Sequence, residues 1–227
     1  MRNLPIVVRI AASVVWLTST AIYAIAEESK FAPLPAKISS FGAAVDGSSL
    51  YVYGGHVGQA HAHSKDNLST AFLRLDLEQP SKWEELKPIV GLQGLPLVAN
   101  GGKLYRIGGL DAKNAKKEDA DLFSVKDVEC FDPKSGQWTV IAPLPEGRSS
   151  HDAIAYDGKI YVVGGWLLAG KETGEEWLTK ALVLDPSAAE PKWEELPEQT
   201  FQRRALAVAA ARGRIYAIGG MTPDHEM

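Results

Sequence analysis

One short sequence pattern recurs four times along this chain and constrains its fold more than any other feature. The pattern is an apolar residue, a tyrosine, two further residues and a pair of glycines, and its first glycines lie 54, 56 and 55 residues apart. A tryptophan follows each of the first three pairs by 29 or 30 residues. A repeat of this length predicts an array of similar supersecondary units. The repeated positions are Tyr51, Gly54, Gly55 and Trp83; Tyr105, Gly108, Gly109 and Trp138; Tyr161, Gly164, Gly165 and Trp193; and Tyr216, Gly219 and Gly220.

Each repeat divides into four predicted strands. A small apolar run such as Ala43–Val45 precedes a glycine-containing turn, where glycine permits the positive φ angles of a tight hairpin. The tyrosine segment is the second strand, and its terminal glycine pair lets backbones approach closely. An alternating segment such as Val128–Asp132 is the third strand, and the tryptophan segment is the fourth. A four-stranded antiparallel unit that repeats at this length is a blade of a β-propeller.

The tyrosine–glycine–glycine step, the Asp132-Pro133 and Asp185-Pro186 turns and the tryptophan that follows them resemble the kelch repeat, including the type in the central domain of galactose oxidase. The resemblance covers Pro35 to Gly220. It implies an all-β propeller in which the glycine pairs and the repeated aromatic residues are structural, so we expect them to lie in the core. The expected propeller domain spans 35–227, with repeats at about 35–88, 89–145 and 146–198 and a partial repeat at 199–227.

The number of blades is unusual for such a fold. The chain holds three complete repeats and the first two strands of a fourth, hence about three and a half blades, whereas propellers typically have four to eight. An incomplete ring leaves strand edges exposed, and exposed edges invite association. We therefore expect a propeller that is incomplete at its C-terminal side. The alternative is a half-propeller that closes by self-association through the open edge.

The N-terminal segment Met1–Ala26 has the features of a secretory signal. It contains no acidic residue, carries Arg2 and Arg9, and ends an apolar run with the small residues of an Ala-x-Ala cleavage site. Residues 27–34 are then a linker. We expect an exported protein, periplasmic or secreted, without a stable membrane span after cleavage. An uncleaved membrane anchor is the alternative, because the apolar run approaches the length that spans a bilayer.

Composition excludes several classes of function. The net charge is −4 and no stretch is dense in Lys or Arg, so we expect no nucleic-acid partner. The single cysteine, Cys130, excludes an intrachain disulfide and lies in an alternating segment typical of a packed strand. Copper chemistry like that of galactose oxidase needs a cysteine cross-linked to a tyrosine, and the position of Cys130 disfavours it. No phosphate-binding loop, dinucleotide fingerprint or hydrolase elbow occurs, and we expect no cofactor.

Candidate chemistry lies in the long segments between the second and third strands of each blade, because long loops on a rigid scaffold often carry function. The first contains His56, His61 and His63, three of the five histidines. These side chains are candidates to contact a polar ligand. Zinc or copper ligation is a weaker alternative, and an ordinary exposed polar loop is the third. The predicted loops are His56–Ala71, Leu110–Lys126 and Trp166–Lys180.

Two arginines occupy equivalent places in the repeat. Arg148 and Arg203 each lie sixteen residues before a glycine pair. This spacing predicts that both stand at the start of a first strand and face the central channel. Their planar donors suit a carboxylate, a phosphate or a sugar hydroxyl. The alternative is an ion pair with a loop acid such as Glu146. His151 either joins the channel mouth or caps its strand.

Trp166 and Trp177 depart from the repeated tryptophan position and occupy the third loop. Both rings are candidates to stack on a sugar or to bind a peptide, and loop packing is the alternative for Trp177. We therefore expect an exported binding module whose loop face holds a protein or carbohydrate ligand. One alternative is a sugar isomerase similar to the exported kelch protein N-acetylneuraminate epimerase, a sialic-acid mutarotase, in which Arg148 holds the carboxylate and a loop His or Glu moves protons. A structural interaction repeat is the second alternative.

Overall fold

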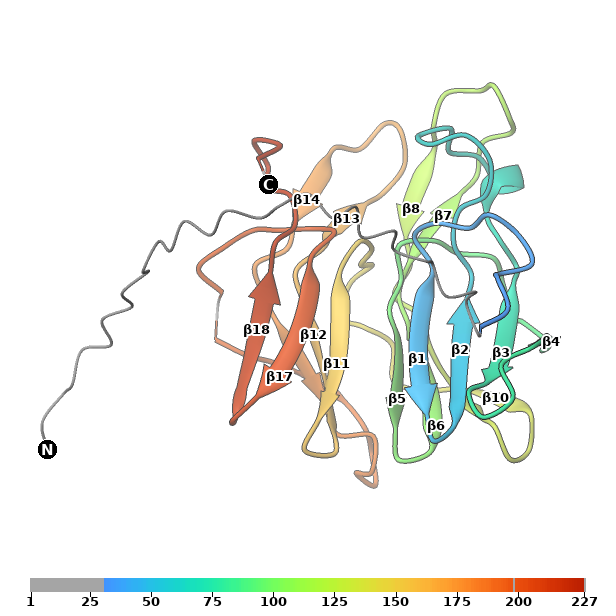
Figure 1. Cartoon of the computed structure of the whole chain (residues 1–227). Helices are drawn as coiled ribbons and strands as arrows, with labels where there is room; N and C mark the ends of the chain where they lie inside the picture. The colour runs from blue at the N-terminus through green and yellow to red at the C-terminus, as the bar shows by residue number, and fades with distance from the viewer. Residues whose placement is uncertain (1–30, 198, 227) are drawn as a thin grey trace, which may run out of the picture.

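The computed structural model describes residues 31–197 and 199–226, and in them the repeats form a curved row of antiparallel sheets (Figure 1). The architecture is the all-β propeller expected from the sequence, with three complete blades and half of a fourth. Blade 1 contains β1 (Gly42–Asp46), β2 (Ser49–Tyr53), β3 (Phe72–Asp76) and β4 (Trp83–Glu85). Blade 2 contains β5 (Leu97–Asn100), β6 (Lys103–Ile107), β9 (Val128–Asp132) and β10 (Gln137–Val140). Blade 3 contains β11 (Asp152–Tyr156), β12 (Lys159–Val163), β15 (Leu182–Leu184) and β16 (Trp193–Glu195), and the half-blade contains β17 (Ala207–Ala211) and β18 (Arg214–Ile218).

The segments predicted as loops contain regular structure of their own. In blade 2 the chain pairs β7 (Leu110–Ala112) with β8 (Leu122–Ser124), and in blade 3 it pairs β13 (Trp166–Leu168) with β14 (Glu175–Trp177). The loop of blade 1 has one short 3-10 turn, η1 (Lys65–Asn67). These hairpins stand at the same end of the blades in Figure 1 and give the loop face a second layer of strands. Long connections close into hairpins because paired backbone groups are satisfied without water.

The glycine pairs allow neighbouring blades to pack backbone against backbone. The N–H of Gly55 donates to the carbonyl of Leu92 in blade 2 at 2.7 Å, and a Cβ on Gly54 would lie 2.4 Å from the same oxygen. This confirms the close approach that the sequence predicted. The same bond recurs from Gly109 to Arg148 at 2.9 Å and from Gly165 to Arg203 at 2.8 Å.

A ladder of backbone hydrogen bonds joins the four blades beside their innermost strands. Gly94 donates to Ser40 at 2.8 Å, Ser150 donates to Gly94 at 2.8 Å, and Ala205 donates to Ser150 at 2.7 Å. All four residues have a positive φ, between 52° and 58°. The same backbone turn therefore recurs in each blade. This inner ladder fixes the relative positions of the loops that rise above it.

The repeated aromatic residues pack between blades where a following blade is present. Tyr51 and Tyr105 are buried, with 3% and 6% exposure, and Cys130 is buried in the core as its segment predicted. Tyr161 is half-buried, and Tyr216 is 42% exposed. Burial therefore falls towards the half-blade, because among the described residues no further blade covers β18.

The predicted signal segment 1–26 lies outside the described residues, as does most of the predicted linker 27–34. Within the part of the chain that the structure describes, no helix is long and apolar enough to cross a membrane. Export of the protein therefore stays a prediction from the sequence.

Candidate functional site

A cavity of about 530 Å³ opens on the loop face and is built by all four blades. The inner ladder borders this cavity, because its four residues, Ser40, Gly94, Ser150 and Ala205, all line it. Among its lining residues Arg204 is the one with a permanent charge, and the lining contains no Asp, Glu or Lys. The other lining residues are Ser39, His56, Ala60, His61, His63, Gln93, Leu110, Leu122, Trp166, Leu168 and Met221.

Three histidines from blade 1 form one wall of this cavity. His56 is buried, and its Nε2 lies 3.0 Å from the carbonyl oxygen of Gln59. The ring of His63 lies edge-on to His56 at 5.4 Å and to His61 at 6.4 Å, and its Nδ1 is 3.1 Å from Nε2 of Gln93. Burial lowers the pKa of His63, and the fields of the other two histidines lower it further. This environment therefore favours the uncharged form of the His63 ring.

The three histidine rings meet edge to face rather than around a common point. Within residues 31–197 and 199–226, no group of three or more His, Cys, Asp or Glu side chains is placed to hold a metal ion. The zinc or copper alternative therefore gains no support, whereas the contact with a polar ligand remains compatible with the geometry.

Trp166 and Arg204, which also line the cavity, form an aromatic and cationic cluster with Trp177. Trp166 and Trp177 face each other across the β13–β14 pair, with ring centroids 5.7 Å apart. The guanidinium carbon of Arg204 lies 4.0 Å from the centroid of Trp166 and 5.6 Å from that of Trp177, within the range of cation–π attraction. Two backbone hydrogen bonds, of 3.1 and 2.9 Å, pair Arg204 with Met221. Segments far apart in the sequence thus build one wall.

Several buried polar atoms of these walls have no hydrogen-bond partner among the described residues. They are Nε1 of Trp166, Nε of Arg204 and Nδ1 of His56. The carbonyl of Gln59 can only accept, so Nε2 of His56 donates to it, and Nε1 of Trp166 and Nε of Arg204 are donors as well. Buried polar groups are normally paired, so unpaired ones beside a cavity mark positions where a ligand or water completes the bonding.

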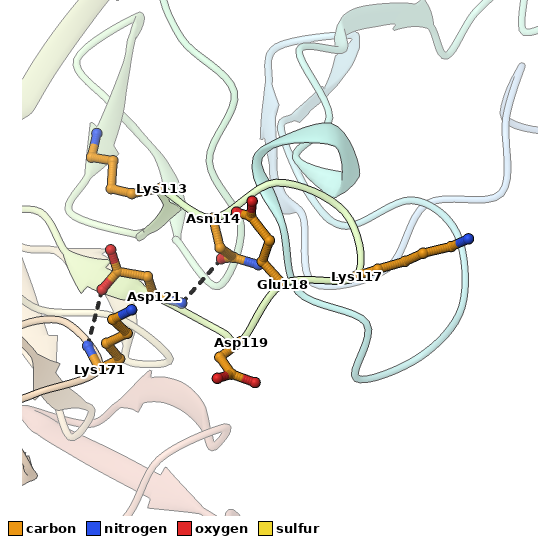
Figure 2. A pocket seen from close by; sticks show the side chains of 7 residues that line it. All are labelled: Lys113, Asn114, Lys117, Glu118, Asp119, Asp121 and Lys171. Atoms are coloured by element: carbon orange, nitrogen blue, oxygen red, sulfur yellow. Dashed lines mark hydrogen bonds between the residues drawn. The ribbon is translucent and has the colours of Figure 1, made fainter.

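The loop of blade 2 holds the histidine wall in place through Asn114. Its Nδ2 donates to the carbonyl of His63 at 2.7 Å, and its own carbonyl accepts from the N–H of Lys65 at 3.0 Å. Figure 2 shows how Asp121 links this loop to blade 3: its N–H donates to Oδ1 of Asn114, and its carboxylate accepts from the N–H of Lys171. One chain of bonds therefore joins the loops of three blades.

This loop borders a second pocket, of about 560 Å³. Figure 2 shows the side chains that line it, and all except Asn114 are charged. Three lysines and three acidic residues line it, so it presents no single sign of charge to a ligand. Two of its lining residues, Asn114 and Asp121, make the hydrogen bonds that join the loops of the three blades, so we assign this pocket a structural role. Its lining residues are Lys113, Asn114, Lys117, Glu118, Asp119, Asp121 and Lys171.

Arg148, which the sequence placed towards the channel, is fully buried between blades. Its Nη1 donates to the carbonyls of Gly164 at 3.2 Å and Lys180 at 2.9 Å, and its Nη2 lies 3.6 Å from a carboxylate oxygen of Glu146. Burial lowers its pKa to about 10, with Glu146 opposing that shift. The geometry matches the ion-pair alternative, and Arg148 does not line the loop-face cavity.

Arg203 and His151 also lie apart from the cavity lining. Nη1 of Arg203 donates to the carbonyls of Gly219 at 3.3 Å and Gly220 at 2.9 Å, which repeats the bond of Arg148 one blade later. His151 is buried, and it lines a smaller hollow of about 310 Å³ that shares the inner ladder. Burial lowers its pKa well below 6.5, with the charge of Arg148 adding to the effect.

The sequence analysis found the histidines and Trp166 but missed Arg204, Gln93 and Met221. The signal for Arg204 was its place beside Arg203, because successive side chains of an extended segment point to opposite sides. When Arg203 reaches the glycine carbonyls, Arg204 faces the loop side. Met221 pairs with Arg204 in an isolated antiparallel bridge, and no sequence pattern near either residue predicted that pairing.

Comparisons of this chain with known protein families, proteins and structures agree with this fold. The model of the KLHDC2/KLHL20/DRC7 Kelch-repeats domain matches residues 14–220. Similar curated proteins include Kelch-like protein 35 of Mus musculus, 27% identical over 199 residues, which are 86% of this chain and 30% of that protein. Kelch-like protein 33 of Homo sapiens is 32% identical over 160 residues, 70% of this chain and 26% of that protein. The chain thus spans less than a third of these relatives.

A solved structure, that of YjhT, superposes with a TM-score of 0.64 at 20% sequence identity. The likeness covers 85% of this chain and 61% of that one, and it shows a shared fold. The blades, the glycine pairs that pack them and the family match over most of the chain lead to one conclusion. This chain belongs to the kelch-repeat family.

Proposed function

We propose that this kelch-repeat chain is a binding module whose loop-face cavity holds a segment of a partner protein. The observation that carries the proposal is the cavity itself, because its walls come from four blades and join residues that are 165 positions apart, from His56 to Met221. Its volume of about 530 Å³ lies in the range of ligand pockets, roughly 300 to 1,000 Å³.

The walls offer both of the contacts that a bound segment needs. Trp166 and Leu168 supply apolar surface, the exposed His61 supplies a polar group, and the buried Gln93 adds another within the lining. The clamp through Asn114 holds these loops in place before a ligand arrives, and a preformed site loses less conformational entropy on binding.

The proposal is tested by selecting ligands for residues 31–227 from a displayed random-peptide library and, in parallel, from a glycan array. The selected ligands are then measured against Trp166→Ala and His63→Ala, with Lys134→Ala as a control on the opposite side of blade 2. We expect peptides to be enriched and both cavity variants to weaken binding by about tenfold or more, since each removes a central contact. Ligands that bind both cavity variants as tightly as the unchanged protein contradict the proposal, and enrichment of glycans alone replaces the peptide with a carbohydrate.

The mutarotase alternative loses its proposed carboxylate ligand, because Arg148 is buried against backbone carbonyls. The cavity lining also holds no acidic side chain to pair with a histidine in proton transfer. We therefore expect no acceleration of the exchange between the α and β forms of N-acetylneuraminate, followed by nuclear magnetic resonance. An acceleration that disappears in His63→Ala overturns the binding-only function.

We propose in addition that the protein is exported, on the strength of the acid-free segment 1–26 and its Ala-x-Ala end. The test is N-terminal sequencing of the full chain expressed in a bacterial host and recovered by cell fractionation. A mature chain that begins at Glu27 in the exported fraction supports the proposal. A chain that begins at Met1 in the cytoplasm contradicts it.

A further inference from the structure

The two ends of the row of blades leave apolar side chains open at positions that the blades between them bury. Figure 1 shows blade 1 at one end of the row and the half-blade at the other. Two residues after the repeated tyrosine, the side chain is at most 6% exposed in each complete blade, whereas Ile218 of the half-blade is 55% exposed. At the opposite end, Val45 on β1 is 54% exposed. The buried residues at the compared position are Tyr53, Ile107 and Val163.

The interface between neighbouring blades has two different sides, and the chain builds it three times. We call the side with the tyrosine and its glycine pair the front surface of a blade, and the side that faces the preceding blade the back surface. A Cβ on the first glycine of each complete blade would lie 2.4 or 2.5 Å from a carbonyl of the next blade, whereas a Cβ on Gly219 meets nothing within 4 Å. The half-blade therefore presents an uncovered front surface, which contains Tyr216, Ile218 and Gly219.

Blade 1 presents the matching back surface. Ala153 and Ala155 of β11 pack in the core between blades 2 and 3, and they belong to the back surface of blade 3. Ala43 and Val45 hold the same places on β1, three and five residues after the ladder residue, and both are exposed. One end of the row thus carries the half of an interface that the other end needs.

The inner ladder gives the two ends complementary hydrogen-bonding groups. Each blade donates to the blade before it, as Gly94 does to Ser40 and Ala205 does to Ser150. Among the described residues the ladder stops at the N–H of Ser40 and at the carbonyl of Ala205. The first is a donor and the second is an acceptor, so Ser40 of a second copy can continue the ladder from Ala205.

Blade 1 also carries the connection that a preceding blade supplies in the other interfaces. Nε1 of Trp83 donates to the carbonyl of Ala32 at 3.0 Å, and the tryptophans of blades 2 and 3 make the same bond to a residue 51 positions earlier. Residues 32–35 and 142–145 share the sequence Ala-Pro-Leu-Pro. This segment lies beside the outer strand β4, and the half-blade holds only the inner strands β17 and β18. The two therefore fit side by side on blade 1.

From these complementary ends we propose that two copies of this chain pair front to back, so that the half-blade of each copy packs on blade 1 of the other. A front-to-back contact either closes into a ring or continues as a filament. Each copy contributes three blades and a half-blade, so two copies fill eight blade positions, and closed propellers hold about four to eight. The pair therefore closes, and dilution releases single copies with open ends. The inference goes beyond the proposed function, because it concerns the ends of the row and not the loop-face cavity.

The experiment measures the mass of residues 27–227 by light scattering after gel filtration and by sedimentation equilibrium, at about 1 to 100 µM. We expect twice the mass of the single chain, with dissociation into single chains on dilution. The mass of a single chain at about 100 µM overturns the proposal. A mass that keeps growing with concentration overturns the closure by two copies.

Three variants locate the contact. Ile218→Glu places a carboxylate on the front surface and Val45→Glu places one on the back surface, so each should weaken association about tenfold or more by burying an unpaired charge. Val140→Glu is the matched control, because this valine is 77% exposed on β10, an outer strand, and the variant should pair as the unchanged chain does. All three positions are open in a single copy, so circular dichroism and urea midpoints should stay close to those of the unchanged chain.

Mixing Ile218→Glu with Val45→Glu distinguishes front-to-back pairing from edge-to-edge pairing of two β18 strands. In a front-to-back pair the mixture holds one unchanged interface, so it should recover association that neither variant shows alone. Failure to recover it, or a Val45→Glu chain that pairs as tightly as the unchanged one, overturns the front-to-back contact. The binding of library peptides to the cavity is a separate measurement, so its failure counts against the proposed function alone.

Discussion

The indole N–H of Trp138 donates to the backbone carbonyl of Lys87 at 3.1 Å, and Lys87 lies four residues after Trp83 in the preceding blade. The next blade repeats the relationship, since Trp193 donates to the carbonyl of Ala142 at 2.9 Å, four residues after Trp138. Trp138 and Trp193 thus each bind the end of the preceding blade, and the ring of Trp138 also packs against Tyr53 and Phe72 of that blade. Because both bonds join residues 51 positions apart, the regular spacing of the repeats places each of these tryptophans at the same contact between blades.

This contact predicts different losses of stability for two substitutions of Trp138. Trp138→Phe removes the hydrogen bond but keeps a ring against Tyr53 and Phe72, so we expect a loss of about 1 kcal/mol. Trp138→Ala removes the ring as well and should cost about 3 kcal/mol. Urea unfolding measures both. If the two variants are equally unstable, the hydrogen bond rather than ring packing dominates.

The glycine pairs predict a contrast between Gly164 and Gly219. Both have positive φ, of 68° and 64°, so alanine adds similar backbone strain at each, about 1 to 2 kcal/mol. A Cβ on Gly164 would also lie 2.5 Å from the carbonyl of Arg203, whereas a Cβ on Gly219 meets nothing within 4 Å. Gly164→Ala should therefore destabilise residues 31–227 clearly more than Gly219→Ala in urea unfolding. Equal losses would show that another segment or copy covers Gly219.

His151 predicts a dependence of stability on pH. Its folded pKa is well below 6.5 because it is buried, whereas the unfolded ring titrates near 6.5. The unfolded state therefore binds the proton first, so stability is present above about pH 6.5 and falls as the pH drops below that value. His151→Leu should flatten the decline in the urea midpoint between about pH 7.5 and 5.5. The exposed His225→Leu is the control, and an unchanged slope in His151→Leu would assign the effect to another group.

The equivalent arginines predict a further difference. Arg148 is fully buried and bonds to two carbonyls of blade 3, so Arg148→Met should lower the free energy of unfolding by about 2 to 4 kcal/mol. Arg203 makes the same kind of bond in the half-blade, where the surroundings are more exposed, and Arg203→Met should cost about 1 kcal/mol or less. Urea unfolding tests both values. A folded Arg148→Met protein that loses ligand binding without losing stability would restore the ligand role considered from the sequence.

Most of the fold was predictable because the information is local and repeated. Each tyrosine–glycine–glycine step specifies a strand that ends where a neighbouring backbone approaches, and four copies at nearly equal spacing specify blades whatever the loops contain. The sequence also placed His56, His63 and Trp166 on the loop face, where they line one cavity. Pairing within the loops was missed, because β7–β8 and β13–β14 are three-residue strands without a turn signature strong enough to predict them.

Which arginine faces the cavity was decided by the tertiary structure alone. Arg148, Arg203 and Arg204 are chemically alike in the sequence, and the side of the backbone on which each lies depends on the close approach of the next blade. The glycine carbonyls take Arg148 and Arg203 into the packing between blades, while the backbone pairing with Met221 and the two tryptophan rings place Arg204 in the wall of the cavity. Repetition within the chain determined the blades, and contacts between distant segments determined the site, because burial and pairing arise only when the blades meet.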